Sequence, residues 1–417
     1  MSEGKVYVIG GGLSGLSAAV ALAGAGHNVE LIEAANQAGG RCRSYFDSAL
    51  GRTIDNGNHL VLSGNHATFS YLRAIGAENG LVGPNRAEFT FADLRTGKRW
   101  TITPNDGPLA WWVLSNKRRV PGTKASDYLG MAGLMFANKR QRVEDAMTCK
   151  GTLWERLLEP FLLAALNLQP EIGSAALAGA IVRETLAKGG RHYYPRVAEP
   201  HLASALVDPA LAYLKAKGAL VRLGQRVRRL TISGARIASF DVGEETQLGT
   251  KDSVVLAVPP WVAAELLPGL KTPTEHSAIV NAHYLVTPPS GLPPIIGLIG
   301  GTAQWVFAFP DRLSVTVSGA DQLVDLDRES LAQTLWNDVA HVHGLSAELP
   351  PWQIVKEKRA TFAATPEQDA LRPNAATEYA NLLLAGDWTQ TGLPATIEGA
   401  IRSGQKAAEL ALRRESL

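Results

Sequence analysis

Residues 5–35 read KVYVIGGGLSGLSAAVALAGAGHNVELIEAA, and this stretch decides the fold. The run VYVIG is short and apolar, which is typical of a buried parallel strand. Three glycines follow in a Gly-x-Gly-x-x-Gly spacing, then an Ala- and Leu-rich segment that predicts a helix, then a second strand that ends at Glu33. This order of strand, glycine turn, helix, strand and acid predicts a dinucleotide-binding α/β unit.

The three glycines have separate physical tasks in such a unit. Gly10 permits the tight turn, Gly12 lets a pyrophosphate approach the backbone, and Gly15 lets the helix pack closely on the strand. Leu13 and Ser14 open the helix, whose free N–H groups and positive dipole end favour phosphate. We therefore predict that these five residues bind the phosphates of a dinucleotide.

Two further features of this region fit a dinucleotide. Glu33, which Ala34 follows, lies about 20 residues beyond the glycines, where a carboxylate accepts hydrogen bonds from ribose hydroxyls. Gly39, Gly40 and Arg41 offer a second close approach of the backbone, with a cation beside the pyrophosphate. An NAD dehydrogenase would normally continue into another helix here, so this order favours FAD.

The composition of the whole chain limits its class. A length of 417 residues suggests about two or three domains, and 46% hydrophobic with 19% charged residues is typical of a globular protein. The net charge of +2 offers no electrostatic footprint for nucleic acid. Cys42 and Cys149 are too few for a disulfide framework or a metal cluster, so no metal site is predicted and a cytoplasmic location is expected. The N-terminus leads directly into a strand, so no signal peptide is expected.

The stretch 284–310 contains no charged residue and has two interpretations. Its length is that of a membrane-spanning helix. It also carries five prolines and four glycines, which interrupt a helix. We therefore predict buried strands joined by turns.

Residues 10–41 resemble the N-terminal signature of the FAD-dependent amine oxidase and phytoene desaturase superfamily, in which the bound dinucleotide is FAD. The resemblance implies an α/β fold, with a Rossmann-like FAD-binding domain of the GR2 type and an interleaved α+β substrate domain. The substrate domain is expected to combine a helical part with a sheet. The FAD-binding domain would comprise residues 1–66, 196–268 and 378–417, and the substrate-binding domain residues 67–195 and 269–377.

The same resemblance implies further contacts with FAD. A polar turn, DNGNH at residues 55–59, would run under the flavin ring. Val227 would contact the adenine through its backbone, and Asp387 would meet the ribitol and pyrophosphate. A closing helix that starts within PATIEG would direct its N–H groups at the flavin. The matching positions are Gly57, Asn58, His59, Val227, Gly386, Asp387, Thr396 and Ile397.

Three longer segments carry a closer resemblance. They lie at residues 55–66, at 153–186 with 200–219, and at 386–404, and together they are similar to the hydroxysqualene dehydroxylase family of bacterial hopanoid synthesis. That similarity implies a long apolar isoprenoid substrate, hydroxysqualene, which hydride from reduced FAD converts to squalene with loss of water. It makes upstream squalene-pathway synthases candidate partners and leaves the electron donor open.

Two other functions stay open at this point. A carotenoid or phytoene-type desaturase would use the same cofactor in the opposite redox direction, with oxidised FAD taking hydride. A prenyl-lipid escort protein of the GDP-dissociation-inhibitor type would keep the architecture without catalysis. Glu33, Arg41 and the Gly386–Asp387 pair are all present, which favours retained FAD and therefore an enzyme.

Departure of an allylic hydroxyl calls for a general acid and for a site that excludes water. A buried carboxyl with a raised pKa can act as that acid. Glu398 has a simpler role as a first-turn helix carboxylate, and His59 as a turn residue. The candidate catalytic residues are His59, Glu155 and Tyr194, and Glu159, Tyr193 and Glu398 stay open beside them.

Two segments, residues 108–120 and 129–143, each pair an apolar run with a basic tail. One interpretation is a peripheral membrane contact, with Trp111 and Trp112 at the interface and the basic residues on anionic lipid. That contact would place the protein on the cytoplasmic face of a membrane. The other interpretation is a pair of ordinary core helices with solvated ends.

Overall fold

The quoted stretch folds as predicted, into β1 (Lys5–Ile9), α1 (Leu13–Gly24) and β2 (Asn28–Ile32). The computed structural model describes residues 4–415, so the outermost limits of the expected FAD-binding domain, residues 1–3 and 416–417, lie outside the described residues. These strands belong to a parallel sheet in the order β10-β2-β1-β14-β20. The other three strands come from later in the chain, at β10 (Leu220–Arg222), β14 (Ser253–Leu256) and β20 (Leu382–Leu384).

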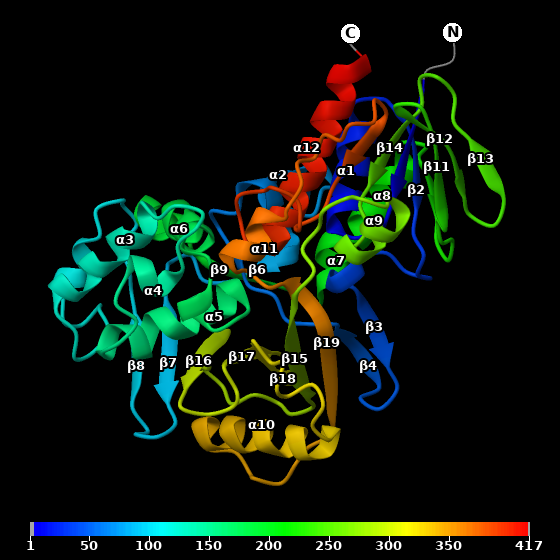
Figure 1. Ribbon diagram of the computed structural model, residues 1–417. Helices are drawn as coiled ribbons and strands as arrows, with labels where there is room; N and C mark the ends of the chain where they lie inside the picture. The colour runs from blue at the N-terminus through cyan, green and yellow to red at the C-terminus, as the bar shows by residue number, and fades with distance from the viewer. Residues whose placement is uncertain (1–3, 416–417) are drawn as a thin grey trace.

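Helix α1 packs both on this sheet and on the last helix, α12 (Ile397–Glu415), which run side by side at the top of Figure 1. Glycine makes the two contacts close. A Cβ added to Gly15 would lie 1.9 Å from the carbonyl oxygen of Gly10, and one added to Gly404 would lie 2.1 Å from that of Ser14. The predicted role of Gly15 in helix–strand packing is therefore confirmed.

A second sheet has seven strands in the order β19-β15-β18-β17-β16-β7-β8. Its β15 to β17 come from residues around and within the uncharged stretch, so the prediction of buried strands is confirmed. Helix α10 (Arg328–His343) covers the lower face of the sheet in Figure 1. The strands are β7 (Phe89–Asp93), β8 (Arg99–Ile102), β15 (His276–Tyr284), β16 (Ile295–Ile299), β17 (Trp305–Phe309), β18 (Arg312–Ser318) and β19 (Trp352–Phe362).

Residues 67–195 of the expected substrate domain hold both helices and strands, because β7 and β8 interrupt the helical part. The apolar segment at 153–186 does form helices, as a π-helical turn Trp154–Leu158 continuing into α5 (Glu159–Leu166), and then α6 (Ala175–Glu184). Residues 108–120, in contrast, form only a 3-10 turn at Trp111–Leu114. Residues 129–143 contain just the end of a 3-10 turn and the short helix α3 (Ala132–Met135).

The interpretation of 108–120 and 129–143 as two ordinary core helices is therefore wrong. The physical reason lies in long side chains that bond the irregular backbone. Arg118 donates to the carbonyl of Thr103 at 2.8 Å, and Arg119 donates to that of Val113 at 3.0 Å. Such bonds satisfy carbonyls that a helix would otherwise use.

Smaller elements complete the chain. Strands β3 and β4 form a hairpin that leads into the polar turn at 55–59, and β11 to β13 form a separate sheet. The remaining bounds are β3 (Ser44–Asp47), β4 (Arg52–Asp55), β5 (Val61–Leu62), β6 (Leu81–Val82), β9 (Pro195–Ala198), β11 (Arg229–Ser233), β12 (Arg236–Asp241), β13 (Glu245–Gln247), α2 (His66–Ala74), α4 (Val143–Ala146), α7 (Leu202–Leu206), α8 (Asp208–Ala216), α9 (Pro260–Leu266) and α11 (Pro366–Ala370).

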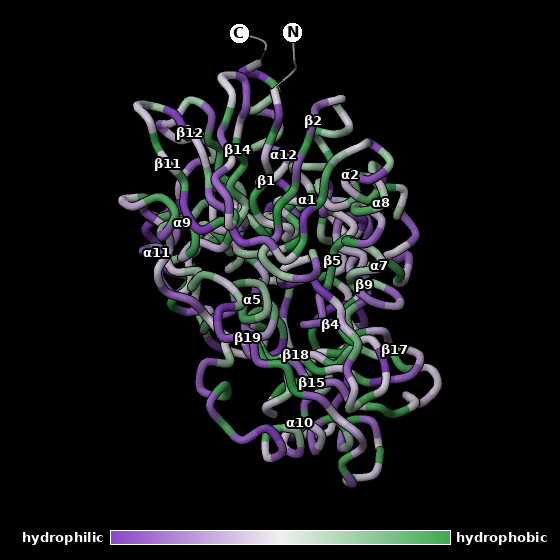
Figure 2. Tube along the Cα trace, turned by 90° about the vertical axis from the view of Figure 1, so that its right-hand side faces the viewer, coloured by the Kyte–Doolittle hydropathy of each residue, from purple (hydrophilic) through white to green (hydrophobic). Residues whose placement is uncertain are grey.

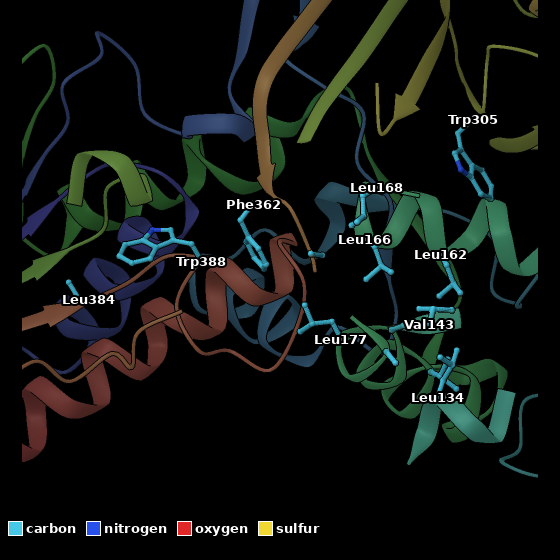
Figure 3. Packing of buried hydrophobic residues seen from close by; sticks show 14 of the residues in the cluster. Leu134, Val143, Leu162, Leu166, Leu168, Leu177, Trp305, Phe362, Leu384 and Trp388 are labelled. Atoms are coloured by element: carbon cyan, nitrogen blue, oxygen red, sulfur yellow. The ribbon is translucent and has the colours of Figure 1, made fainter. Parts of the chain in front are cut away.

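One buried apolar cluster connects the dinucleotide sheet with the helical region. It includes Leu384 on β20, Trp388 after it, Phe362 at the end of β19, and leucines of α5 and α6. Figure 3 shows Phe362 between Trp388 and the helical leucines. Figure 2 colours the chain by the hydropathy of each residue, and apolar residues recur along the strands of both sheets. Trp388, in the turn that follows β20, is therefore part of this core.

Candidate cofactor and substrate site

Two glycine turns face each other at the carboxyl end of β1. The N–H of Gly39 donates to the carbonyl of Gly11 at 2.7 Å, and Gly12 pairs with Gly39 as a parallel bridge. Gly10 has a φ of +110°, and a Cβ there would lie 2.4 Å from the carbonyl oxygen of Ala257. A Cβ on Gly12 would instead meet no atom of the described chain within 4 Å. The space above Gly12 thus fits a pyrophosphate, and Gly40 borders it, with 3.2 Å from its built Cβ to the Cα of Gly12.

Helix α1 begins immediately at this space. Gly12 is its N-cap residue and offers no side-chain hydrogen bond to the first turn. Leu13 and Ser14 are both buried at the helix start. Free N–H groups at a helix N-terminus favour an anion, so the local geometry fits the predicted phosphate contact.

Glu33 lies at the end of β2 with its carboxylate turned toward the glycine turn. Its Oε2 accepts from the N–H of Gly11 at 2.6 Å, and Oε1 accepts from that of Ala35 at 2.7 Å. The N–H of Gln225 donates to the Glu33 carbonyl at 2.9 Å, which brings the chain before buried Val227 to the same edge. Ala34 is exposed beside it. The structure thus gathers Glu33 and Val227 from segments far apart in sequence.

Gln225 is a residue that the sequence interpretation missed. Within residues 4–415, its buried Oε1 accepts no hydrogen bond. A buried acceptor without a partner is costly. Its position beside Glu33 indicates a polar group of the cofactor as the partner, and no sequence pattern pointed to it.

Arg41 and Asp387 form an ion pair across the site, with Nη2 and Oδ2 2.7 Å apart. Arg41 is 42% exposed whereas Asp387 is 7% exposed, and Nη1 of Arg41 also donates to the carbonyl of Ala360. Gly386 has a φ of +154°, and a Cβ there would lie 2.3 Å from the indole nitrogen of Trp388. Its N–H donates to the Ser403 hydroxyl at 2.8 Å, which ties the turn to α12.

The polar turn at 55–59 rests on the second sheet. The N–H of Asn58 donates to the Oδ1 of Asn281 at 3.4 Å, and a Cβ on Gly57 would lie 2.9 Å from the Nδ2 of the same asparagine. The Nδ2 of Asn58 donates to the hydroxyl of Thr316 at 3.2 Å. In the described part of the chain its buried Oδ1 has no partner. Asn281 was not predicted from sequence, because it lies more than 200 residues from the turn that it holds.

His59 is half-buried at the end of this turn. Burial, and then the charge of Arg41, lower the pKa of His59 to about 4. The imidazole is therefore neutral near pH 7. The structure thus places His59 within the influence of the Arg41 charge, and it leaves the histidine without the proton that a general acid donates near pH 7.

The closing helix begins at Ile397 as predicted, with the Thr396 hydroxyl accepting from the N–H of Gly399 at 3.0 Å. Glu398 has a structural task. Its carboxylate accepts from the N–H groups of Ala67 and Thr68 at 3.0 and 2.9 Å, and from the Thr68 hydroxyl at 2.8 Å. It therefore caps α2 from another helix, and the hypothesis that it is the general acid is not supported.

The other acid candidates differ in burial. Glu155 is exposed, so it does not provide the buried carboxyl that the hypothesis requires. The Tyr194 hydroxyl donates to Asp106 at 2.9 Å near the surface. Burial raises the pKa of Tyr193. Burial, followed by the charges of Glu171 and Glu155, raises the pKa of half-buried Glu159, which is the direction that a proton donor needs.

Comparisons with known proteins agree with this geometry. A family model described as flavin-containing amine oxidoreductase matches residues 13–412. A hydroxysqualene dehydroxylase of Rhodopseudomonas palustris is 55% identical over 98% of both chains. A probable zeta-carotene desaturase of Synechococcus elongatus is 23% identical over 99% of both chains. Among solved structures, cyclohexylamine oxidase from Brevibacterium oxydans has a TM-score of 0.75 at 14% identity over the full length of both chains, which shows a shared fold.

Proposed function

Because this chain belongs to the flavin-containing amine oxidoreductase family, we propose that it reduces hydroxysqualene to squalene with loss of water. It is an FAD-dependent oxidoreductase, and the alternative of a non-catalytic escort protein is set aside. The observation that carries the substrate proposal is the 55% identity to a hydroxysqualene dehydroxylase over 98% of each chain, against 23% identity to a carotene desaturase.

Bound FAD supplies the hydride for this reduction. The chain itself has to bind a long apolar substrate and exclude water, because water would recapture the allylic cation as an alcohol. Buried leucines of α5 belong with Trp305 and Phe362 to one packed apolar cluster (Figure 3). We assign the substrate-facing wall to this cluster.

The proton for the departing hydroxyl has two candidate sources. His59 lies in the turn expected under the flavin, but its lowered pKa leaves it neutral near pH 7, so it would have to take up a proton first. The pKa of half-buried Glu159 is raised, chiefly by burial, which is what a proton donor needs. Glu155 and Tyr194 contribute less under this proposal, because one is exposed and the other already donates to Asp106.

We also propose that the predicted domain division holds. The parallel sheet draws its strands from 1–66, 196–268 and 378–417, and the seven-stranded sheet draws from 67–195 and 269–377. Catalysis would take place where the turn at 55–59 meets the second sheet.

A peripheral membrane contact is the route that we propose for substrate entry. Several of the most exposed large apolar side chains fall in one segment, at Leu109, Trp111, Leu114, Leu129 and Phe136, the last being 85% exposed. The guanidinium of Arg118 lies 4.5 Å from the Trp111 ring, which places positive charge beside the apolar surface. Within residues 4–415 no helix has the length and apolarity needed to cross a membrane.

Vesicle sedimentation tests the membrane contact. Replacing Leu129 and Phe136 by serine should release the protein from vesicles that contain anionic lipid. The matched control is Phe46→Ser, since Phe46 is 68% exposed on a different element and should not affect binding. Equal binding by the double variant and the wild type would contradict the contact.

The central experiment is anaerobic turnover of hydroxysqualene with a chemical reductant, with products identified by mass spectrometry. Squalene should accumulate only with enzyme, substrate and reductant together. Mixing experiments fix the redox direction: hydroxysqualene should reoxidise the reduced enzyme, and phytoene should leave the oxidised enzyme unchanged. Reduction of the enzyme by phytoene, without squalene formation, would replace this proposal by the desaturase.

A further inference from the structure

Arg372 is a fully buried arginine that lies outside every site predicted from the sequence. Its side chain has no exposed surface, and Nη1 lies 2.8 Å from the Oδ1 of Asp369, itself buried. The guanidinium also lies over the Phe362 ring at 4.8 Å. A buried charge of this kind is costly unless every donor finds a partner.

The other recorded bonds of this guanidinium, from Nε and Nη2, go to the turn Gly386–Thr391 that follows β20. Nε donates to the carbonyl of Thr389, and the two N–H groups of Nη2 are shared among that carbonyl, the carbonyl of Asp387 at 3.0 Å and the Thr391 hydroxyl at 2.7 Å. One rigid planar group thus holds three residues of this turn. Lysine has no such fork.

Asp387 is consequently held from two sides by arginines. Arg41 bonds its carboxylate from the half-exposed side, and Arg372 bonds its backbone carbonyl from the buried side. Arg41 is the cation expected to serve the cofactor phosphates. Arg372 is the arginine whose bonds go to the backbone of the turn itself.

We propose that Arg372 is a positioning residue for the FAD site: it holds the Gly386–Thr391 turn, and through it Asp387 and the start of α12, in the conformation that binds FAD. The proposal rests on family membership and on these bonds, and it is independent of the identity of the substrate. It predicts two effects of a loosened turn. FAD leaves the holoenzyme faster, and the potential of the bound flavin becomes more negative, because the positive end of the α12 dipole no longer lies in place.

The test compares R372K with the wild-type holoenzyme. The release of FAD is measured by the rise of its fluorescence after dilution. Release from R372K should be about tenfold faster or more, which is the effect of losing one charge-assisted hydrogen bond. The matched control is R236K, since Arg236 on β12 also donates through one Nη to two carbonyls, those of Thr250 and Asp252, which lie outside the 386–391 turn. Unchanged FAD release and potential in R372K, or equal acceleration in R236K, would overturn the proposal.

Chemical rescue separates positioning from general destabilisation. A cavity of about 460 Å³ has Arg372 among its lining residues, and truncation of this side chain would extend the cavity toward the emptied guanidinium position, so R372A should admit free guanidinium from solution. Guanidinium, but not urea at equal concentration, should slow FAD release in R372A. Failure of rescue would contradict the proposal. If R372A does not fold, T391V carries the test, because it removes the hydroxyl that accepts from Nη2, together with the local bonds of that hydroxyl to Leu393, and should accelerate release by about two- to fivefold. A release rate equal to wild type in T391V would then refute the proposal.

Discussion

Replacing Glu398 should test how one helix caps another across the protein. Glu398 is 3% exposed and accepts three hydrogen bonds from Ala67 and Thr68 at the start of α2, where the N-cap residue Asn65 offers no side-chain bond. It also lies 2.8 Å from Nε of Arg402. In Glu398→Ala those donors lose their acceptor inside the protein.

The expected loss is about 3–5 kcal/mol of the free energy of unfolding, because three buried donors lose a charged acceptor, while Arg402 keeps its pair with Glu184. Unfolding entropy of about 2.1 cal/mol/K per residue gives about 0.9 kcal/mol/K for 417 residues. A loss of about 4 kcal/mol therefore lowers Tm by about 4–5 °C. Glu398→Gln keeps an acceptor and should lose about half as much.

Differential scanning calorimetry of the holoenzyme measures this change. The control lies on the same helix, at Glu409→Gln, because Glu409 is 42% exposed and pairs only with Lys406 and Arg413. It should leave Tm unchanged within error, as exposed ion pairs contribute little. Equal Tm values for the Glu398→Gln and Glu409→Gln variants would refute the capping role.

Three further predictions concern the cofactor turn and the buried histidines. Gly12→Ala should fold in normal yield but lose FAD absorbance on purification, whereas Gly15→Ala should lower the yield of folded protein, since only the second Cβ meets backbone, at 1.9 Å. The pKa of His283 is lowered to about 4 by burial, so the unfolded state binds its proton first as pH falls. Stability should be complete above about pH 6.5 and decline toward pH 4 by about 3 kcal/mol, and a flat denaturant midpoint across that range would contradict this. His59→Gln and Glu159→Gln should be compared by their rates of squalene formation. Loss of the proton donor should lower kcat about 100-fold and remove one limb of the pH profile. Wild-type rates in both variants would exclude both residues as the donor.

Much of the dinucleotide unit could be predicted because its signals are local. A glycine that needs a positive φ, such as Gly10, or one that a Cβ would drive into backbone, such as Gly15, leaves a mark within a few residues of the strand that it follows. Buried strands at 284–310 were predictable for a similar reason, since prolines exclude a continuous helix. The interpretation of 108–120 and 129–143 as core helices was wrong because the apolar runs are short there. In the first segment, side chains such as Arg118 bond backbone carbonyls in place of helical N–H groups.

The sequence by itself determined the strand–glycine–helix unit, the closing helix at Ile397 and the resemblance that pointed to FAD. Only the tertiary structure decided what Glu398 and Arg372 do. Glu398 caps a helix that lies 330 residues earlier in the chain. Arg372 holds a turn that is close to it in sequence, but the core around that turn is built from distant segments. A hydrogen bond between remote residues leaves no periodicity in the chain, because its partners are chosen by how the packed elements bring them together.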